Sequence, residues 1–110
     1  MLKYLSIVTI TYNNPQDLLN TYKSLESFRE AGGQHIIVNG GSTIKALIDD
    51  DCVLLEEPDR GIYDALNKGI NLVQTPYLML IHSGDLFVST LNILEKQIST
   101  MDKNELDILL

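Results

Sequence analysis

The chain is poor in several features that would place it in other classes. It has one cysteine, so it can form neither an internal disulfide nor a cysteine-based metal site. With 15 acidic and 8 basic residues, its net charge is −7, which argues against nucleic-acid binding because phosphate contacts need a basic face. No apolar run approaches the ~20 residues of a membrane span.

The composition is nevertheless that of a folded domain. Hydrophobic residues make up 45% of 110 residues, which suits one domain with one core. The N-terminal apolar stretch lacks a small-residue cleavage site and soon meets Asn-Asn-Pro, so we interpret it as a first strand rather than a signal peptide. Together with the single thiol of Cys52, these features predict a reducing, cytoplasmic location.

Apolar runs alternate with amphipathic segments along the whole chain. We predict strands at residues 5–10, 35–38, 53–56 and 77–81, and another beginning at 107–110. Helices are predicted from Pro15, after an Asn14 cap, through Phe28, at 43–48, at 62–73, and after a cap at Ser89 or Thr90. This alternation predicts an α/β fold, a Rossmann-like three-layer α/β/α arrangement around a mostly parallel sheet.

Three polar segments follow predicted strands, at residues 11–14, 39–42 and 82–85. Because parallel strands end at one edge of a sheet, these segments should converge on one crevice, where such folds bind ligands. The segment 39–42 contains two glycines, which allow close approach of the backbone to an anion. The same glycines also suit a plain strand-to-helix turn.

Asp85 lies just after the fourth predicted strand and is preceded by Gly84. One interpretation is that its carboxylate caps the next turn. The other is a ligand of a divalent cation, because Mg²⁺ or Mn²⁺ commonly takes one or two carboxylates plus phosphate oxygens. Elsewhere we expect Ile62, Leu66 and Ile70 to be core, and Lys68 to be solvated. His35 is expected to be structural and residues 49–51 to form a solvated turn.

Four stretches together carry a resemblance. They are SIVTITYNN, IIVNGGST, EPDRGIYDALNKGI and YLMLIHSGDLF, in this order between residues 6 and 87. This set resembles the family 2 glycosyltransferases, which are nucleotide-sugar-dependent enzymes of the GT-A fold. It looks closest to members that build bacterial surface polysaccharides.

The resemblance implies two loops that contact the nucleoside. The family's first loop lines the base pocket and is matched here by Thr11, Tyr12 and Asn13. Its second loop contacts base and ribose and is matched by Asn39, Gly40 and Ser42. The family often carries aspartate at the position of Asn39, so this contact would be a neutral hydrogen bond and the preferred base stays open.

The resemblance also implies contacts to the phosphates. Asp59 and Arg60 match the loop before the GIYDALNKG helix, where Arg60 would pair with phosphate. Ser83, Gly84 and Asp85 occupy the position of the D-X-D type motif. Asp85 stands where the family has its metal ligand, which implies Mg²⁺ or Mn²⁺ as cofactor.

The implied activity is transfer of a sugar, with inversion, from a nucleoside-diphosphate sugar to a glycan or lipid-linked acceptor hydroxyl. It would serve polysaccharide biosynthesis in the cytoplasm, at or near the inner membrane. Family members are usually longer than this chain and carry the acceptor site and general base in their later half. We therefore expect residues 1–110 to be the nucleotide-sugar-binding part, with the base beyond Leu110. Self-association through the face left open would follow.

Two alternatives remain open at this point. The chain would instead be a non-catalytic nucleotide-binding or interaction module, which its length and the single acid of the Ser-Gly-Asp segment favour. A phosphoacceptor receiver domain shares the alternating pattern, but it expects an acidic pair after the first strand and an aspartate ending the third. Thr11-Tyr12 and Glu56-Glu57-Pro58 fit that expectation badly.

Overall fold

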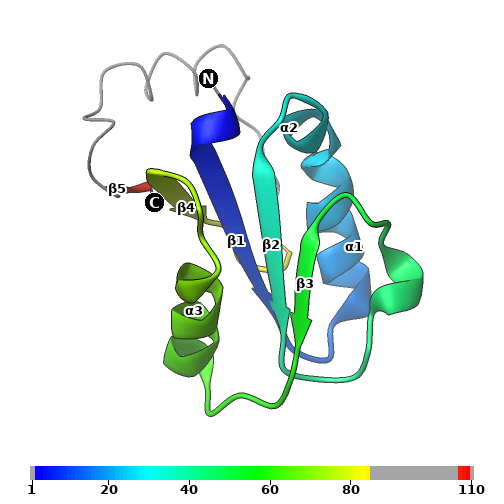
Figure 1. Ribbon diagram of the computed structural model, residues 1–110. Helices are drawn as coiled ribbons and strands as arrows, with labels where there is room; N and C mark the ends of the chain where they lie inside the picture. Colours follow the sequence, from blue (N-terminus) through cyan, green and yellow to red (C-terminus); the bar gives the residue numbers. More distant parts are fainter. Residues whose placement is uncertain (1, 85–106, 110) are drawn as a thin grey trace.

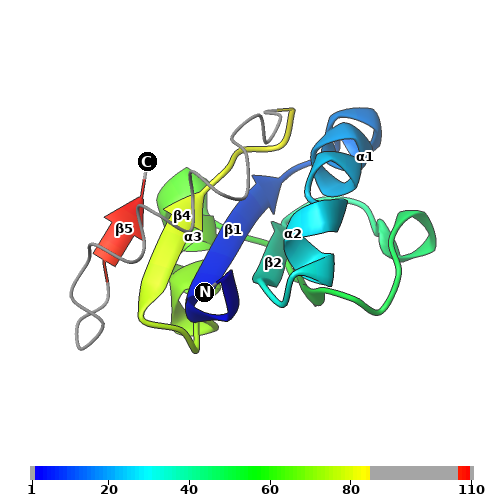
Figure 2. The ribbon, with the colours of Figure 1, turned by 90° about the horizontal axis from the view of Figure 1, so that it is seen from above.

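The computed structural model describes residues 2–84 and 107–109, and its centre is a parallel sheet of five strands. Their order across the sheet is β3-β2-β1-β4-β5, and every neighbouring pair is parallel (Figures 1 and 2). The strands are β1 (Leu5–Thr11), β2 (Gln34–Asn39), β3 (Val53–Glu56), β4 (Tyr77–Leu80) and β5 (Asp107–Leu109). The predicted parallel α/β sheet is confirmed. The last predicted helix, after Ser89 or Thr90, lies outside the described residues.

Helices cover both faces of the sheet. Two of them, α1 (Pro15–Ser24) and α2 (Glu26–Glu30), lie on one face, and α3 (Ile62–Asn71) lies on the other (Figure 1). Single turns of 3₁₀ helix occur at Leu2–Tyr4 and Lys45–Leu47. The three-layer, Rossmann-like arrangement predicted from the sequence is therefore confirmed. No helix among the described residues is long and apolar enough to cross a membrane.

Alternating side chains of the central strands supply both cores. In β1, Leu5 and Ile7 pack with Phe28 of α2 on one face of the sheet. Val8 points to the other face and packs with Ala65 of α3. Ile37 of β2 belongs to a third cluster, under α1. A strand buried on both faces needs apolar side chains on both, which explains why these runs are almost continuously hydrophobic.

The chain reverses its direction of travel across the sheet beside β1. From β1 it adds β2 and then β3 on one side, and afterwards β4 and β5 on the other. The carboxyl ends of β1 and β4 are therefore neighbours, and the next strands in the sequence, β2 and β5, lie on opposite sides of this pair. Open parallel sheets bind ligands at such a switch point.

The first helix differs from its prediction. One helix was expected from Pro15 through Phe28, but the structure breaks it into α1 and α2 at Leu25. The hydroxyl of Ser24 donates to the carbonyl of Thr21 at 2.7 Å. Such back-bonding competes with helix hydrogen bonds and bends helices. Asn14 holds the N-cap position, yet its amide donates to the Asp17 carboxylate at 2.6 Å instead of capping the helix.

Two further details of helix prediction need correction. The helix expected at 43–48 is only the 3₁₀ turn Lys45–Leu47. In α3, Ile62 is 50% exposed rather than core, because the first turn of the helix extends past the buried contact. That contact centres on Ala65 and on Gly69, which has no side chain, so α3 can approach the sheet closely.

A buried histidine joins the sheet to α2 and to the turn before β3. His35 is 1% exposed, and its Nε2 lies 2.9 Å from the Thr9 hydroxyl. Its Nδ1 lies 3.2 Å from the Arg29 guanidinium, which can only donate, so Nδ1 accepts and Nε2 carries the proton of the neutral ring. Arg29 also stacks 3.8 Å over the Tyr22 ring and pairs with Asp51 at 3.0 Å. The structural role expected of His35 is confirmed, whereas Asp51 is ion-paired rather than merely solvated.

We predict that Gly69→Ala destabilises the protein. A Cβ at position 69 would lie 2.5 Å from Val8 Cγ1 and 3.2 Å from Val38 Cγ2. The resulting overpacking costs about 1–3 kcal/mol and outweighs the better helix propensity of alanine, worth about 1 kcal/mol. Urea unfolding measures the difference. Asn67→Ala, at an exposed position of the same helix, is the control and should be neutral or stabilising; equal effects of the two changes would contradict this packing.

We also predict a histidine-dependent loss of stability in mild acid. Burial, and then the charge of Arg29, lower the pKa of His35 to about 3. Between about pH 6.5 and 3 the unfolded chain therefore binds a proton that the folded chain does not, so stability falls as pH falls, by about 1 kcal/mol per pH unit. His35→Gln should flatten the unfolding free energy between pH 6.5 and 5. An unchanged slope in His35→Gln would refute the assignment.

Candidate functional site

A cavity of about 520 Å³ opens at the carboxyl edge of the sheet, between the ends of β1 and β4. It therefore lies at the switch point of the fold. Its walls come from the end of β1, the loop after β3, the start of α3 and the segment after β4. The lining residues are Ile10, Thr11, Tyr12, Asp59, Gly61, Ile62, Ala65, His82 and Ser83.

Backbone pairing continues past β4 and brings Ser83 beside β1. The N–H of Ile81 donates to the carbonyl of Val8 at 3.0 Å, and the N–H of Ser83 donates to that of Ile10 at 3.2 Å. The polar segment after β4 thus stays in register with the central strand. These hydrogen bonds hold the segment after β4 against the end of β1, and both segments line the cavity.

Two hydroxyls of the cavity walls are unsatisfied. The Oγ1 atom of Thr11 and the Oγ atom of Ser83 are shielded from solvent and have no hydrogen-bond partner among the described residues. Buried polar groups are nearly always paired, so such exceptions require an explanation. Both belong to residues that line the cavity, which fits a site completed by a polar ligand.

The position before Asp85 has a backbone conformation that favours glycine. Gly84 has φ of 100°, and its N–H donates to the Thr21 hydroxyl of α1 at 2.9 Å. The chain is therefore directed toward α1 as it leaves the cavity. Asp85, the metal ligand implied by the resemblance, lies outside the described residues, so its role stays a prediction.

The amide of Asn39 shapes the second loop. Its Oδ1 accepts the N–H of Gly41 at 3.0 Å, and its Nδ2 lies 2.7 Å from the carbonyl of Ser42 and 2.8 Å from Glu56. The side chain is 1% exposed and does not line the cavity. In this structure Asn39 holds the loop closed from within, although the resemblance implies a contact with the base.

Glu56 holds the second loop in place, a role that the sequence analysis missed. At the end of β3 it stands in register with Asn39 of β2. Its carboxylate accepts the Asn39 amide, the Thr43 hydroxyl at 2.8 Å and the Ile44 N–H at 2.8 Å. Burial disfavours its charge, but the hydrogen bonds from Ile44, Asn39 and Thr43 outweigh burial, so the pKa of Glu56 is lowered. Only the register of β3, which the sequence leaves open, could have identified it.

The first and second loops are hydrogen-bonded to each other. Asn13 has φ of 50°, and its Oδ1 accepts the N–H of Ser42 at 2.8 Å. The N–H of Gly40 donates to the carbonyl of Thr11 at 3.1 Å. Tyr12, between these contacts, is 66% exposed at the cavity. The two predicted nucleoside loops are therefore joined to each other, and the first of them presents an aromatic ring at the cavity.

Asp59 packs against Gly40 of the second loop. Its Oδ1 accepts the N–H of Gly61 at 3.1 Å, and its Oδ2 occupies the space that a Cβ at position 40 would need. Asp59 also lines the cavity. A side chain at position 40 would displace the Asp59 carboxylate, so glycine at this position allows Asp59 to pack beside the second loop.

Arg60 and Lys68, the next two basic residues after Asp59, differ in their exposure and their partners. Arg60 is exposed, and its N–H donates to the Asp64 carboxylate at 2.9 Å, which is the main reason that the pKa of Asp64 is lowered. Lys68, expected to be solvated, is instead only 21% exposed in its side chain. Its Nζ lies 3.1 Å from Glu57 Oε1, and it is therefore an ion-paired residue of α3.

The structure thus brings most of the predicted site residues to one edge. Of the residues named from the sequence, Thr11, Tyr12, Asp59 and Ser83 line the cavity. Others form the loops around it: Asn13, Asn39, Gly40, Ser42, Arg60 and Gly84. In the part of the chain that the structure describes, no group of three or more His, Cys, Asp or Glu side chains could hold a metal ion.

We predict that Gly40 and Asp59 are coupled. Gly40→Ala alone should destabilise the protein by about 1–3 kcal/mol, because the new methyl group overlaps the Asp59 carboxylate. Combined with Asp59→Ala, the same change should cost much less, which gives a coupling energy of about 1 kcal/mol or more in a double-mutant cycle by urea unfolding. Strictly additive effects would show that the two residues do not pack together.

Comparison with known proteins places these loops in a family. The model of the family described as "Glycosyl transferase family 2" matches residues 6–110. Two curated relatives are uncharacterized glycosyltransferases of Mycobacterium tuberculosis, from strains CDC 1551 and H37Rv; each is 35% identical over 95 residues, covering 74% of this chain and 34% of the relative. The chain therefore spans about a third of the length of these relatives. Because the family model extends over both joined loops, the segment before α3 and the Ser-Gly-Asp segment, the chain belongs to glycosyl transferase family 2.

Proposed function

We propose that this chain binds a nucleoside-diphosphate sugar as the donor part of an inverting glycosyltransferase. The observation that carries the proposal is the cavity of about 520 Å³ at the switch point, lined by Thr11 and Tyr12 of the first loop, which is hydrogen-bonded to the second. A family 2 domain uses a nucleotide sugar, and this cavity lies where parallel sheets bind nucleotides. The acceptor would be a hydroxyl of a glycan or of a lipid-linked sugar in polysaccharide biosynthesis.

The surrounding residues suit the parts of such a donor. The exposed ring of Tyr12 can stack on a base, since stacking on an aromatic ring is available to every base. The carboxylate of Asp59 can accept hydrogen bonds from ribose hydroxyls. The guanidinium of Arg60, on an exposed side chain next to the cavity wall, can pair with phosphate. The unsatisfied hydroxyls of Thr11 and Ser83 supply further polar contacts.

A divalent cation fits the chemistry of the donor set. The residues that line the described cavity carry hard oxygen atoms, namely the carboxylate of Asp59 and the hydroxyls of Thr11 and Ser83. Mg²⁺ and Mn²⁺ prefer oxygen ligands and commonly share them with substrate phosphates. We propose Asp85 as the principal protein ligand, following on from Gly84. When bound, the cation would neutralise charge on the departing diphosphate.

The proposed reaction is a single displacement at the anomeric carbon. An acceptor hydroxyl oxygen forms the new glycosidic bond while the bond to the nucleoside diphosphate breaks, and the configuration inverts. The hydroxyl proton passes to a general base, to which we assign no described residue. The contribution of the described residues is to bind and orient the donor, which lowers the barrier by holding the reacting atoms in place.

A second candidate is a non-catalytic nucleotide-binding module of the same fold. The single carboxylate in the described cavity wall favours it. Both candidates predict nucleotide binding. They differ in turnover, which requires an acceptor and a base.

The proposal predicts metal-dependent protection by a nucleoside diphosphate. Melting is measured with uridine, guanosine, adenosine, cytidine and thymidine diphosphates, each with and without Mn²⁺. One of them should stabilise the fold in the presence of Mn²⁺, by about 2.7 kcal/mol when present at a hundred times its Kd. Asp85→Ala should remove the dependence on Mn²⁺, and Asp59→Asn should weaken binding.

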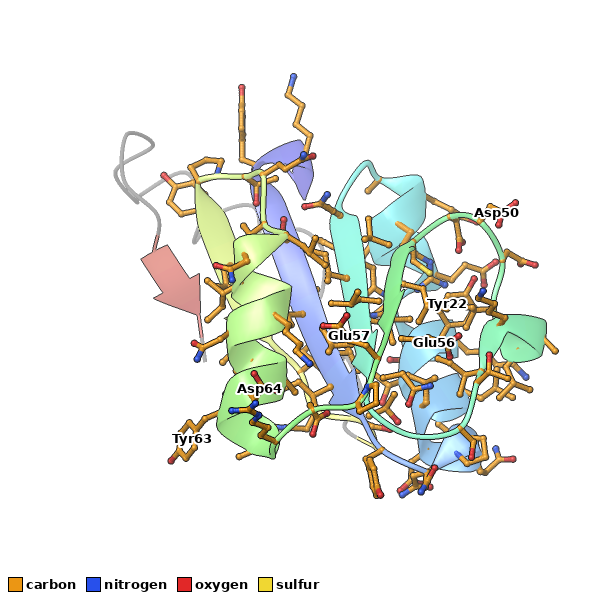
Figure 3. The ribbon with its side chains drawn as sticks, turned by 60° about the horizontal axis from the view of Figure 1, so that its bottom comes forward. Tyr22, Asp50, Glu56, Glu57, Tyr63 and Asp64 are labelled. Atoms are coloured by element: carbon orange, nitrogen blue, oxygen red, sulfur yellow. The ribbon has the colours of Figure 1, made fainter. Side chains whose placement is uncertain are left out.

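The control is Asp50→Ala, which removes an exposed carboxylate on the side of the molecule away from Asp64 and the start of α3 (Figure 3). It should leave both protection and metal dependence unchanged. Absence of protection by every diphosphate would refute donor binding. Protection without turnover of any nucleotide sugar in the presence of acceptors would favour the non-catalytic module.

A further inference from the structure

The loop between β3 and α3 is fastened by two charged side chains of α3. The Nζ atom of Lys68 lies 2.7 Å from the carbonyl oxygen of Pro58 and 3.1 Å from the carboxylate of Glu57. The carboxylate of Asp64 accepts the N–H of Arg60 at 2.9 Å and lies 3.3 Å from Lys68. Figure 3 labels Glu57 on the loop and Asp64 on the helix. The helix thereby contacts the loop at Glu57, Pro58 and Arg60.

The backbone of the loop is anchored at both of its ends as well. The N–H of Glu57 donates to the carbonyl of Asn39 at 3.2 Å, which joins the loop to the end of β2. At the other end, the carbonyl of Gly61 accepts the N–H of Ala65 at 3.1 Å as α3 begins. The side chains of Asp59 and Arg60 lie between these anchors. Their positions therefore depend on contacts made outside the cavity.

Lys68 and Asp64 do not themselves line the cavity, whereas Asp59 and Gly61 do. An ammonium group has three N–H donors, and the three oxygen partners of Lys68 occupy all of them. This saturation leaves Lys68 no donor for a phosphate. Any effect of Lys68 on a ligand must therefore pass through the loop.

We propose that Lys68 and Asp64 are positioning residues that preset the loop at 57–61 for the donor nucleotide, an inference that rests on the proposed function. A loop that is already ordered loses less conformational freedom when it binds, so affinity increases without a new contact to the ligand. Ion pairs near the surface contribute little to the free energy of unfolding. The network should consequently affect affinity far more than global stability.

The test compares Lys68→Met, Lys68→Arg and wild type in the whole chain. Hydrogen–deuterium exchange measures protection of the Glu57, Arg60 and Gly61 amides without nucleotide. Calorimetry with Mn²⁺ and the protective nucleoside diphosphate measures Kd. Lys68→Met should accelerate exchange at the loop and weaken binding about tenfold. A loss of this size is typical when a residue that orients a ligand-binding residue, without touching the ligand, is removed. Lys68→Arg keeps the donors and should restore most of both.

Two further variants sharpen the comparison. Lys23→Met removes an exposed lysine of α1 and should alter neither Kd nor exchange at the loop. Asp64→Asn should also weaken binding, and combined with Lys68→Met it should cost less than the product of the two single losses, because both act through one loop.

The outcomes separate the two hypotheses. If wild type binds no nucleoside diphosphate, the proposed function fails and the positioning role fails with it. If wild type binds but Lys68→Met binds equally well, or its loop amides stay equally protected, the positioning role alone is overturned. A fall in melting temperature with unchanged Kd would likewise show that Lys68 is merely structural.

Discussion

The parallel pairing of β1 with both of its neighbours is the constraint on which the rest of the structure depends. β1 bonds to β2 from Ser6 to Thr11 and to β4 from Leu5 to Val8, so the carboxyl ends of these strands share one edge. Both faces of β1 are buried, one under α1 and α2 and the other under α3. The cavity lies at the carboxyl edge of the same pair, where the strand that follows β1 and the strand that follows β4 were added on opposite sides of the pair.

The loops at this edge are shaped mostly by one another. Asn39 and Glu56 hold the second loop from inside, Asn13 ties it to the first, and Asp59 packs where position 40 lacks a side chain. Each of these polar groups is satisfied within the protein, so the wall exists before a ligand arrives. Preformed sites bind with a smaller ordering cost than sites that fold around their ligand.

The sequence predicted the fold better than it predicted these contacts. Strand positions, the parallel sheet and the converging loops follow from local patterns, since apolar runs and glycine breaks are local properties. The roles of Glu56 and Lys68 depend on which strands become neighbours and how α3 lies beside the loop. Likewise, Ser24 ends α1 through a hydrogen bond to its own helix, a feature without a periodic signature. Helical spacing places Ile62 and Gly69 on one face of α3, but of these two only Gly69 is buried there.

The charge at the site imposes a further requirement on any nucleotide ligand. Glu56, Glu57 and Asp59 bring three carboxylates to this edge of a chain whose net charge is already −7. A diphosphate adds negative charge, and like charges within a few ångströms repel strongly where water is excluded. Lys68 is already committed to Glu57 and Asp64, which leaves Arg60 as the only cationic side chain of the loop at 57–61. Under the proposed function, an anionic donor would therefore need the Arg60 guanidinium, a divalent cation, or both, to offset the carboxylates at this edge of the sheet.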